Sequence, residues 1–267
     1  MKLFIILLLL IESVNCYIFS YPANIYKKKY NDKIIKIYEP ENIKRDNLNC
    51  LLFFTGGNSL IPGDLYNNFI SSLVDYKYSV SVLPNDFIAC KQYIKDIENK
   101  YSCIIPISHS SGCVNIINLI NNFKNINKSI FLDPVDNNKL VNIFNNIEDN
   151  DKLLYLNDLL IITAEKSYKW SLDPFYTPFI FAFRLNIQNL LKLKSDLNIE
   201  YIESDEHGHC DILDPLWADP MHSTIARGTE NRDYKNLQKY HIWLTQQIHN
   251  FIYRDDNDNN YTLDDSY

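Results

Sequence analysis

Short apolar segments alternate with longer segments of helical periodicity along most of this chain, and this order restricts the fold more than any other feature. The apolar segments are rich in β-branched or aromatic residues and occupy residues 33–40, 50–54, 79–83, 103–108, 129–133, 159–163 and 199–204. A further strand is expected at residues 17–22, paired with 33–40. Apolar residues at helical spacing occupy residues 64–76, 86–101, 113–123, 138–149, 186–194 and 237–254.

This alternation predicts the α/β class. Strands that are apolar nearly throughout, separated by helices, are typical of a mostly parallel central sheet flanked by helices on both faces. The chain has 267 residues, of which 46% are apolar and 13% aromatic, so it can bury one substantial core. We therefore expect a single α/β domain over residues 17–253.

The N-terminus has the pattern of a secretory signal peptide. Lys2 precedes an unbroken apolar run at residues 3–11, and residues 14–16 offer small or neutral side chains before a cleavage point. The run is shorter than the roughly 20 apolar residues of a membrane span. Residues 1–16 are thus expected to direct the chain to the secretory lumen or outside the cell, with no integral membrane span after cleavage. An uncleaved anchor or a buried first strand is the alternative.

Charge and cysteine content limit the partners. The formal net charge of −7 argues against nucleic acid or an anionic membrane surface, because both require a basic face. The acidic segment 254–267 lacks an apolar face and is expected to be disordered. Cleavage after Cys16 would leave an odd number of cysteines and therefore at least one unpaired thiol: Cys50, Cys90, Cys103, Cys113 and Cys210.

Residues 108–112, SHSSG, follow the apolar segment 103–108 and precede the helix expected from residue 113. The pattern resembles the nucleophile elbow G-x-S-x-G, in which a tight strand-to-helix turn exposes the central serine. Ser110 is the central residue, Gly112 fills the second small position and Ser108 replaces the first glycine. The carboxyl ends of parallel strands are where such sheets place their sites. A plain polar turn is the alternative reading.

A serine nucleophile requires a histidine to accept its proton and an acid to orient that histidine. The loop after the strand at 199–204 carries His207 and His209, late in the chain, as the order serine, acid, histidine demands. We expect Asp133 to supply the acid, because it ends the apolar segment 129–133. Asp136 and Glu165 are the alternatives.

Three motifs in this order resemble the chlorophyllase family of α/β-hydrolases. That family carries GHSRGG, a DPV segment and GHMDMLD, where this chain has SHSSGC, LDPVD and GHCDILD. The resemblance extends from about residue 33 to 251. It implies the α/β-hydrolase fold, carboxylic-ester hydrolysis and a triad of Ser110, Asp133 and His209. Ser108, Ser111 and Cys113 depart from the family pattern, which bears on the substrate.

The oxyanion hole of this fold uses the backbone N–H after the nucleophile and a second N–H from the loop after an earlier strand. These donors are expected at Ser111 and at Gly57, which lies in the loop after residues 50–54. Glycine allows close approach of a substrate to the backbone. A tight glycine turn without a role is the alternative.

The expected partner is a small, apolar ester, and the chemistry requires no metal or cofactor. A zinc site formed by His207, His209, Cys210 and Asp211 is a rival interpretation, although no second pair of ligands accompanies it. A catalytically inactive α/β-hydrolase-fold binding module is the other rival.

Overall fold

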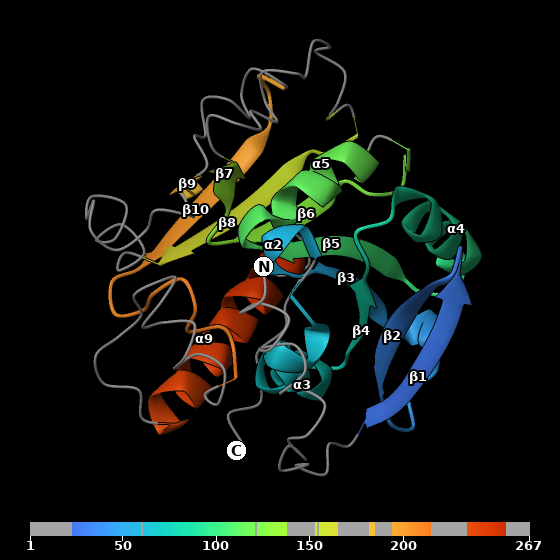
Figure 1. Ribbon diagram of the computed structural model, residues 1–267, viewed down its shortest axis with the longest axis horizontal. Coiled ribbons are helices and arrows are strands. Elements are labelled where there is room, and N and C mark those ends of the chain that lie inside the picture. Colours follow the sequence, from blue (N-terminus) through green and yellow to red (C-terminus); the bar gives the residue numbers. More distant parts are fainter. Residues whose placement is uncertain are drawn as a thin grey trace, which may run out of the picture.

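The computed structural model of the chain describes residues 23–59, 61–120, 122–137, 153, 155–164, 182–184, 194–214 and 234–254. Within these ranges, eight strands form one sheet in the order β1-β2-β4-β3-β5-β6-β8-β10 (Figure 1). Their bounds are β1 Ala23–Tyr30, β2 Lys33–Pro40, β3 Asn49–Phe54, β4 Tyr78–Leu83, β5 Cys103–His109, β6 Lys128–Leu132, β8 Asp158–Ala164 and β10 Asn198–Ser204.

The sheet is mostly parallel. From β4 to β10 each neighbouring pair runs parallel, whereas β1 and β2 form an antiparallel hairpin whose second strand joins β4. The carboxyl ends of β3, β5, β6, β8 and β10 therefore meet at one edge of the sheet. In an open parallel sheet this edge is where side chains from different strands can form a site.

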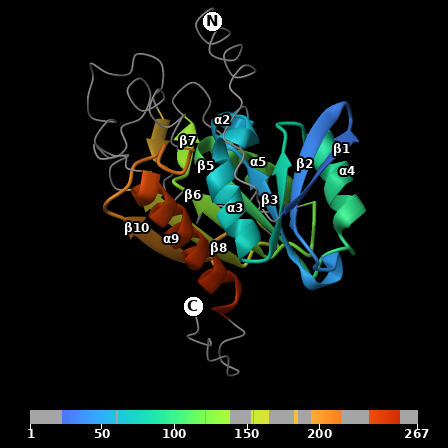
Figure 2. The same ribbon diagram turned by 90° about the horizontal axis from the view of Figure 1, so that it is seen from below.

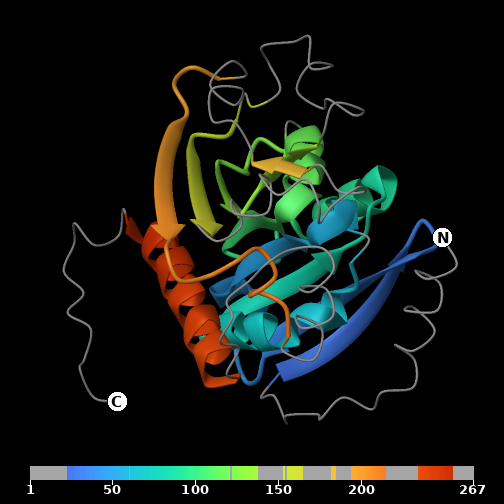
Figure 3. The same cartoon turned by 60° about the vertical axis from the view of Figure 1, so that its left-hand side comes forward.

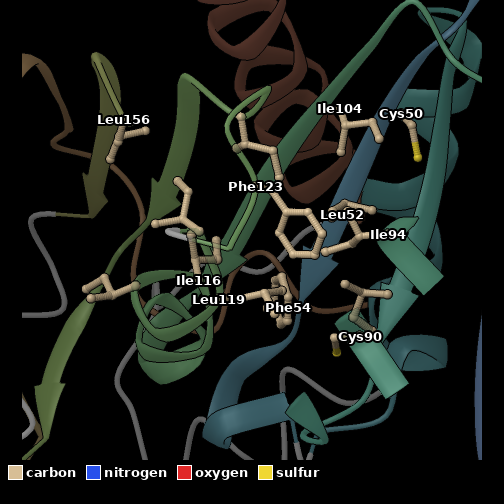
Figure 4. Close-up of a cluster of buried hydrophobic side chains, with 14 of the residues drawn as sticks. Cys50, Leu52, Phe54, Cys90, Ile94, Ile104, Ile116, Leu119, Phe123 and Leu156 are labelled. Carbon is tan, nitrogen blue, oxygen red and sulfur yellow. The ribbon is translucent and has the colours of Figure 1, made fainter. Parts of the chain in front are cut away.

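Helices cover both faces of the sheet. Helices α4 (Phe87–Ile97) and α5 (Cys113–Ile120) lie on one face, and α3 (Asn67–Asp75) and α9 (Tyr234–Ile252) on the other, in front of the strands in Figure 2. Alternation along β3 explains the two layers, since successive side chains of a strand point to opposite faces. Leu52 and Phe54 join the core under α4 and α5 (Figure 4), whereas Leu51 and Phe53 join the core under α3 and α9.

Shorter elements connect these layers. The 3₁₀ helices are η1 (Arg45–Asn47), η2 (Gly63–Tyr66) and η3 (Ser110–Gly112), and α2 (Gly56–Ser59) is a single helical turn after β3. A second sheet, of two short strands among the described residues, pairs β7 (Val135–Asn137) with β9 (Ala182–Arg184). These elements matter because α2 and η3 lie against each other at the carboxyl edge of the main sheet.

The outer hairpin differs from the sequence-based expectation. The strand paired with β2 is β1, Ala23–Tyr30, whereas the strand expected at residues 17–22 lies outside the described residues. Most β1 side chains are exposed, and the strand is rich in lysine, so it lacks the apolar run that marks the inner strands. Lysines on an edge strand also discourage pairing with another chain.

Other expectations fall on residues that the structure does not describe. These are the signal peptide at residues 1–16, the helix at 138–149, most of that at 186–194, and the tail beyond residue 254. Among the described residues, none of the helices combines the length and the apolar character needed to cross a membrane.

Candidate active site

Ser110 begins the tight turn η3, between β5 and α5. Its φ angle is 56°, in the left-handed region that a serine adopts only at a cost in backbone energy. His109 before it is still extended, with φ −113° and ψ 141°. The chain thus reverses from strand to helix at Ser110, as the sequence predicted for a nucleophile elbow, and the serine lies at the carboxyl end of β5.

Gly112 allows the elbow to pack onto the end of β3. A Cβ atom at this position would lie 2.5 Å from the carbonyl oxygen of Phe54 and 2.7 Å from that of Thr55. Both distances are far below a normal contact, and both partners are backbone atoms that cannot rotate away. The requirement for a small residue two positions after Ser110 therefore comes from the neighbouring strand.

Asp133 follows β6 at the same edge of the sheet. Its φ angle is 40°, and its amide donates a hydrogen bond to the carbonyl of Ile162, 2.6 Å away. Its carboxylate oxygen Oδ1 accepts a hydrogen bond from the amide of Ala164 at 3.0 Å. Both bonds fasten the residue to β8, so the orientation of the carboxylate is set by the neighbouring strand.

His209 lies in the loop after β10 and links the other two side chains. Its Nε2 atom is 3.0 Å from Ser110 Oγ, and its Nδ1 atom is hydrogen-bonded to Asp133 Oδ2. A carboxylate only accepts hydrogen bonds, so Nδ1 carries the proton and the Nε2 lone pair faces the serine hydroxyl. The structure therefore brings together the three side chains that the sequence nominated.

The structure describes the two alternative acids, Asp136 and Glu165, less fully than Asp133. Of the three carboxylates considered, Asp133 is the one whose side chain the structure describes. Asp136 lies in β7, where only the backbone is described, and Glu165 lies outside the described residues.

The loop that carries His209 is braced from within. The amide of Gly208 donates to Asp211 Oδ2 at 2.8 Å, and the amide of Asp211 donates back to the Gly208 carbonyl at 3.1 Å. The buried His241 of α9 contacts the carbonyl of Asp211 through Nε2, 3.2 Å away. Burial lowers the pKa of His241 to about 4, so this imidazole is neutral. These contacts explain the aspartate two positions after His209.

Asp214 fastens the end of the same loop to α3. Its carboxylate accepts hydrogen bonds from the amides of Asn67 at 3.2 Å and Asn68 at 2.8 Å, at the first turn of the helix. Its own amide donates to the carbonyl of Leu65 at 2.8 Å. Figure 3 shows the segment after β10 running back toward α3. Burial raises the pKa of this carboxyl to about 7, against the opposing effect of the two amides.

His207 and His209 serve different partners. His207 Nδ1 is 2.7 Å from Ser204 Oγ, and its ring stacks on Tyr240 with centroids 3.9 Å apart. Across the described residues, no group of three or more His, Cys, Asp or Glu side chains is arranged to hold a metal ion.

The expected oxyanion donors lie on neighbouring elements. Ser111 is buried in η3, and Gly57 is exposed in α2 with a φ angle of 61°. In α2 the amide of Gly56 donates to the Tyr66 hydroxyl at 3.0 Å, and that of Ser59 donates to the Thr55 carbonyl at 3.0 Å.

Sequence reasoning missed Tyr66, His241 and Asp214 at this edge, and it weighed Asp211 only as a possible zinc ligand. Tyr66 and His241 lie on helices, and nothing in their local sequence distinguishes them from other core residues. Asp211 and Asp214 did carry a signal, because both fall at matching positions of the GHCDILD motif.

Comparison with known proteins supports the fold. Neither the protein-family models nor the curated proteins include a match to this chain. Among solved structures, a variant of the esterase rPPE aligns with a TM-score of 0.55 at 13% identity, over 91% of this chain and 88% of that chain. Est1E from Butyrivibrio proteoclasticus aligns with a TM-score of 0.51 at 9% identity, over 84% and 99%. The esterase domain of a Rhodothermus marinus protein gives 0.50 at 10%, over 86% and 99%.

At these identities the similarity establishes architecture and nothing finer. The mostly parallel eight-stranded sheet with helices on both faces matches the esterase structures over most of their lengths. The expected fold class is therefore confirmed, and the chain has the α/β-hydrolase fold.

Proposed function

We propose that this protein is a serine hydrolase that cleaves a carboxylic ester, with Ser110, His209 and Asp133 as its catalytic triad. The observation that carries the proposal is the continuous hydrogen-bonded series from Ser110 Oγ through the His209 ring to the Asp133 carboxylate. A strained turn at Ser110 supports it, because backbone strain of this kind gathers at functional positions.

The geometry suits acyl transfer in two steps. His209 Nε2 removes the proton from Ser110 Oγ as the oxygen attacks the ester carbonyl, and the leaving alcohol takes that proton when the carbon–oxygen bond breaks. Water then attacks the acyl-enzyme with the same imidazole as base, which releases the acid and restores the serine. Asp133 holds the Nδ1–H tautomer and stabilises the imidazolium formed in each step.

The amides of Ser111 and Gly57 are the proposed oxyanion donors. Ser111 directly follows the nucleophile, and Gly57 belongs to α2, which lies against η3. Gly57 itself has no side chain that would crowd a substrate, because glycine lacks a Cβ atom. Loss of one such donor typically lowers kcat by about 10²–10³-fold.

The substrate class is inferred from the motifs. The resemblance of SHSSGC, LDPVD and GHCDILD to chlorophyllase motifs supports a small apolar carboxylic ester. Ser108, Ser111 and Cys113 differ from that family beside the nucleophile, so the ester need not be chlorophyll, and a lipase-like or thioester substrate fits the same machinery. The pattern of residues 1–16 supports action in the secretory lumen or outside the cell.

The deciding experiment uses a fluorophosphonate probe and short-chain nitrophenyl esters. The wild-type protein should become labelled and turn over, and Ser110→Ala should do neither while keeping its thermal midpoint. Ser102→Ala is the matched control, since it changes an exposed serine at the other end of β5. A binding module would show neither labelling nor turnover in the wild type, and a zinc enzyme would lose activity to a chelator.

A further inference from the structure

A second histidine, His109, lies directly beside the proposed triad. Its ring centroid is 4.6 Å from that of His209, with the planes inclined by 33°, and only 2% of the residue is exposed. Its Nε2 atom is 2.9 Å from the backbone carbonyl oxygen of His209. A carbonyl oxygen can only accept, so Nε2 of His109 carries a proton and donates it to this bond.

The other nitrogen of His109 faces a buried tyrosine. Nδ1 is 2.9 Å from the hydroxyl of Tyr66, whose ring packs edge-on against the imidazole. Burial lowers the pKa of His109 to about 3, so the ring is neutral and Nδ1 is an acceptor. Tyr66 therefore donates its hydroxyl proton to Nδ1.

The Tyr66 hydroxyl also accepts a hydrogen bond from the Gly56 amide at 3.0 Å. Gly56 can approach this closely because it has no side chain. A Cβ atom there would lie 3.1 Å from His109 Nδ1 and 3.2 Å from the Tyr66 hydroxyl. The amide that the tyrosine holds directly precedes Gly57, the proposed oxyanion donor.

From this geometry we propose that Tyr66 and His109 form a positioning relay between the oxyanion loop and His209. The bonds run in one direction: Gly56 N–H to the Tyr66 hydroxyl, that hydroxyl to His109 Nδ1, and His109 Nε2–H to the His209 carbonyl. The relay rests on the proposed function. It holds the backbone of the proton acceptor and the backbone of the oxyanion donor at a fixed separation, and neither relay residue touches the substrate.

Kinetics with a short-chain nitrophenyl ester test the relay. Tyr66→Phe removes the hydroxyl alone, and His109→Leu removes both ring hydrogen bonds. Each should lower kcat roughly 10- to 100-fold, because small misplacements of catalytic groups cost rates of this order. KM should change by less than about threefold, since ground-state binding is untouched. The proposal would be overturned if the variants changed KM but not kcat, or if both variants kept the wild-type kcat.

Rescue and coupling separate positioning from simple damage to the fold. His109→Gln places an amide N–H near the position of Nε2 and should recover most of the kcat that His109→Leu loses. Tyr66→Phe added to His109→Leu should cause little further loss, because residues that act as one unit are not additive. Fully additive losses, or no recovery in His109→Gln, would contradict the relay.

A second tyrosine–histidine pair provides the matched control. The hydroxyl of Tyr78 is 2.9 Å from His249 Nδ1, the same distance as in the relay, but Tyr78 opens β4 at the opposite edge of the sheet. Tyr78→Phe should leave kcat at the wild-type value. If it lowers kcat as much as Tyr66→Phe, the effect is general destabilisation and the relay fails.

The hydrogen-bond direction can be read without turnover. Long-range proton–nitrogen NMR of the histidine rings should show His109 as the neutral Nε2–H tautomer throughout the pH range in which the protein is folded. An Nδ1–H tautomer would refute the relay even in an active enzyme. Absence of Ser110-dependent turnover would instead refute the proposed function. The NMR experiment would still test the direction of the hydrogen bonds.

Discussion

Asp133 and Ala164 are joined across neighbouring strands by a hydrogen bond of 3.0 Å from the Ala164 amide to the Asp133 carboxylate. The bond leaves the second carboxylate oxygen for His209. The proposed acid thus follows β6, the strand after the proposed nucleophile, and its orientation is fixed by β8, the strand beyond it.

Asp133→Asn should therefore remove most of the activity. An amide in place of the carboxylate favours the wrong histidine tautomer, and kcat for a nitrophenyl ester should fall about 10⁴-fold with little change in fold. Asp136→Asn and Glu165→Gln are the controls for the two other acids. If Glu165→Gln alone abolishes turnover in a folded protein, the assignment of Asp133 is wrong.

Gly112→Ala should destabilise the protein strongly. The new Cβ atom would meet the backbone carbonyls of Phe54 and Thr55, neither of which can move without distorting β3. Overpacking of this kind costs about 3 kcal/mol of unfolding free energy or more. Urea unfolding measures the loss.

Gly63→Ala is the matched comparison for that change. A Cβ atom there would lie 2.7 Å from a methyl carbon of the Val82 side chain, which is part of a partly exposed residue. Its cost should be smaller, about 1 kcal/mol. Equal losses of unfolding free energy in the two variants would show that the backbone contact at the end of β3 is not the reason for the cost at Gly112.

Ser108→Ala should stabilise the protein. The Ser108 side chain is fully buried, and its hydroxyl has no hydrogen-bond partner among the residues that the structure describes. Removing an unpaired buried hydroxyl should recover about 1 kcal/mol of unfolding free energy. Calorimetry should show a rise in Tm of about 2 to 4 °C for a domain of this size. A fall in Tm would mean that the hydroxyl is satisfied in solution.

Asp214 should make stability depend on pH. Its pKa is raised from 3.8 to about 7 in the folded protein, so the folded state holds a proton that the unfolded state has lost between about pH 4 and 7. The stabilising contribution of this carboxyl is therefore complete below about pH 4 and declines as the pH rises through about 7.

The corresponding variant is Asp214→Asn, which does not titrate. The Tm of the wild type minus that of the variant should decrease by several degrees from the acidic to the neutral end of this range. Asp75→Asn, an exposed change at the other end of α3, the helix that Asp214 contacts, is the matched control. A difference in Tm that stays constant with pH would refute the assignment.

The inner sheet could be predicted from sequence because its strands are buried on both faces. Residues 50–54 and 103–108 are apolar almost throughout for this reason, and both are strands in the structure. The hairpin strand β1 was placed wrongly because solvent covers most of it and lysines interrupt its pattern. Strands β7 and β9, of three residues each, are too short to leave a periodic signal.

The same contrast holds for the candidate site. Ser110, Asp133 and His209 could be nominated as a group because each follows a strand and belongs to a short motif, and their side chains lie together in the structure. Tyr66 joins His109 across 43 positions, and Asp214 reaches Asn68 across 146. Such contacts exist only once the chain has folded, so no local pattern of residues could indicate them.

The dependence of the His209 loop on α3 and α9 has a consequence for synthesis. A growing chain acquires its hydroxyl and its carboxylate at positions 110 and 133, but the base arrives only at 209, and the helix that braces its loop ends at Ile252. A polypeptide terminated before that helix would carry Ser110, the proposed nucleophile, without the support for the loop of His209, the proposed base. We expect such fragments to be inert, so that the proposed hydrolysis begins only after α9 has been synthesised.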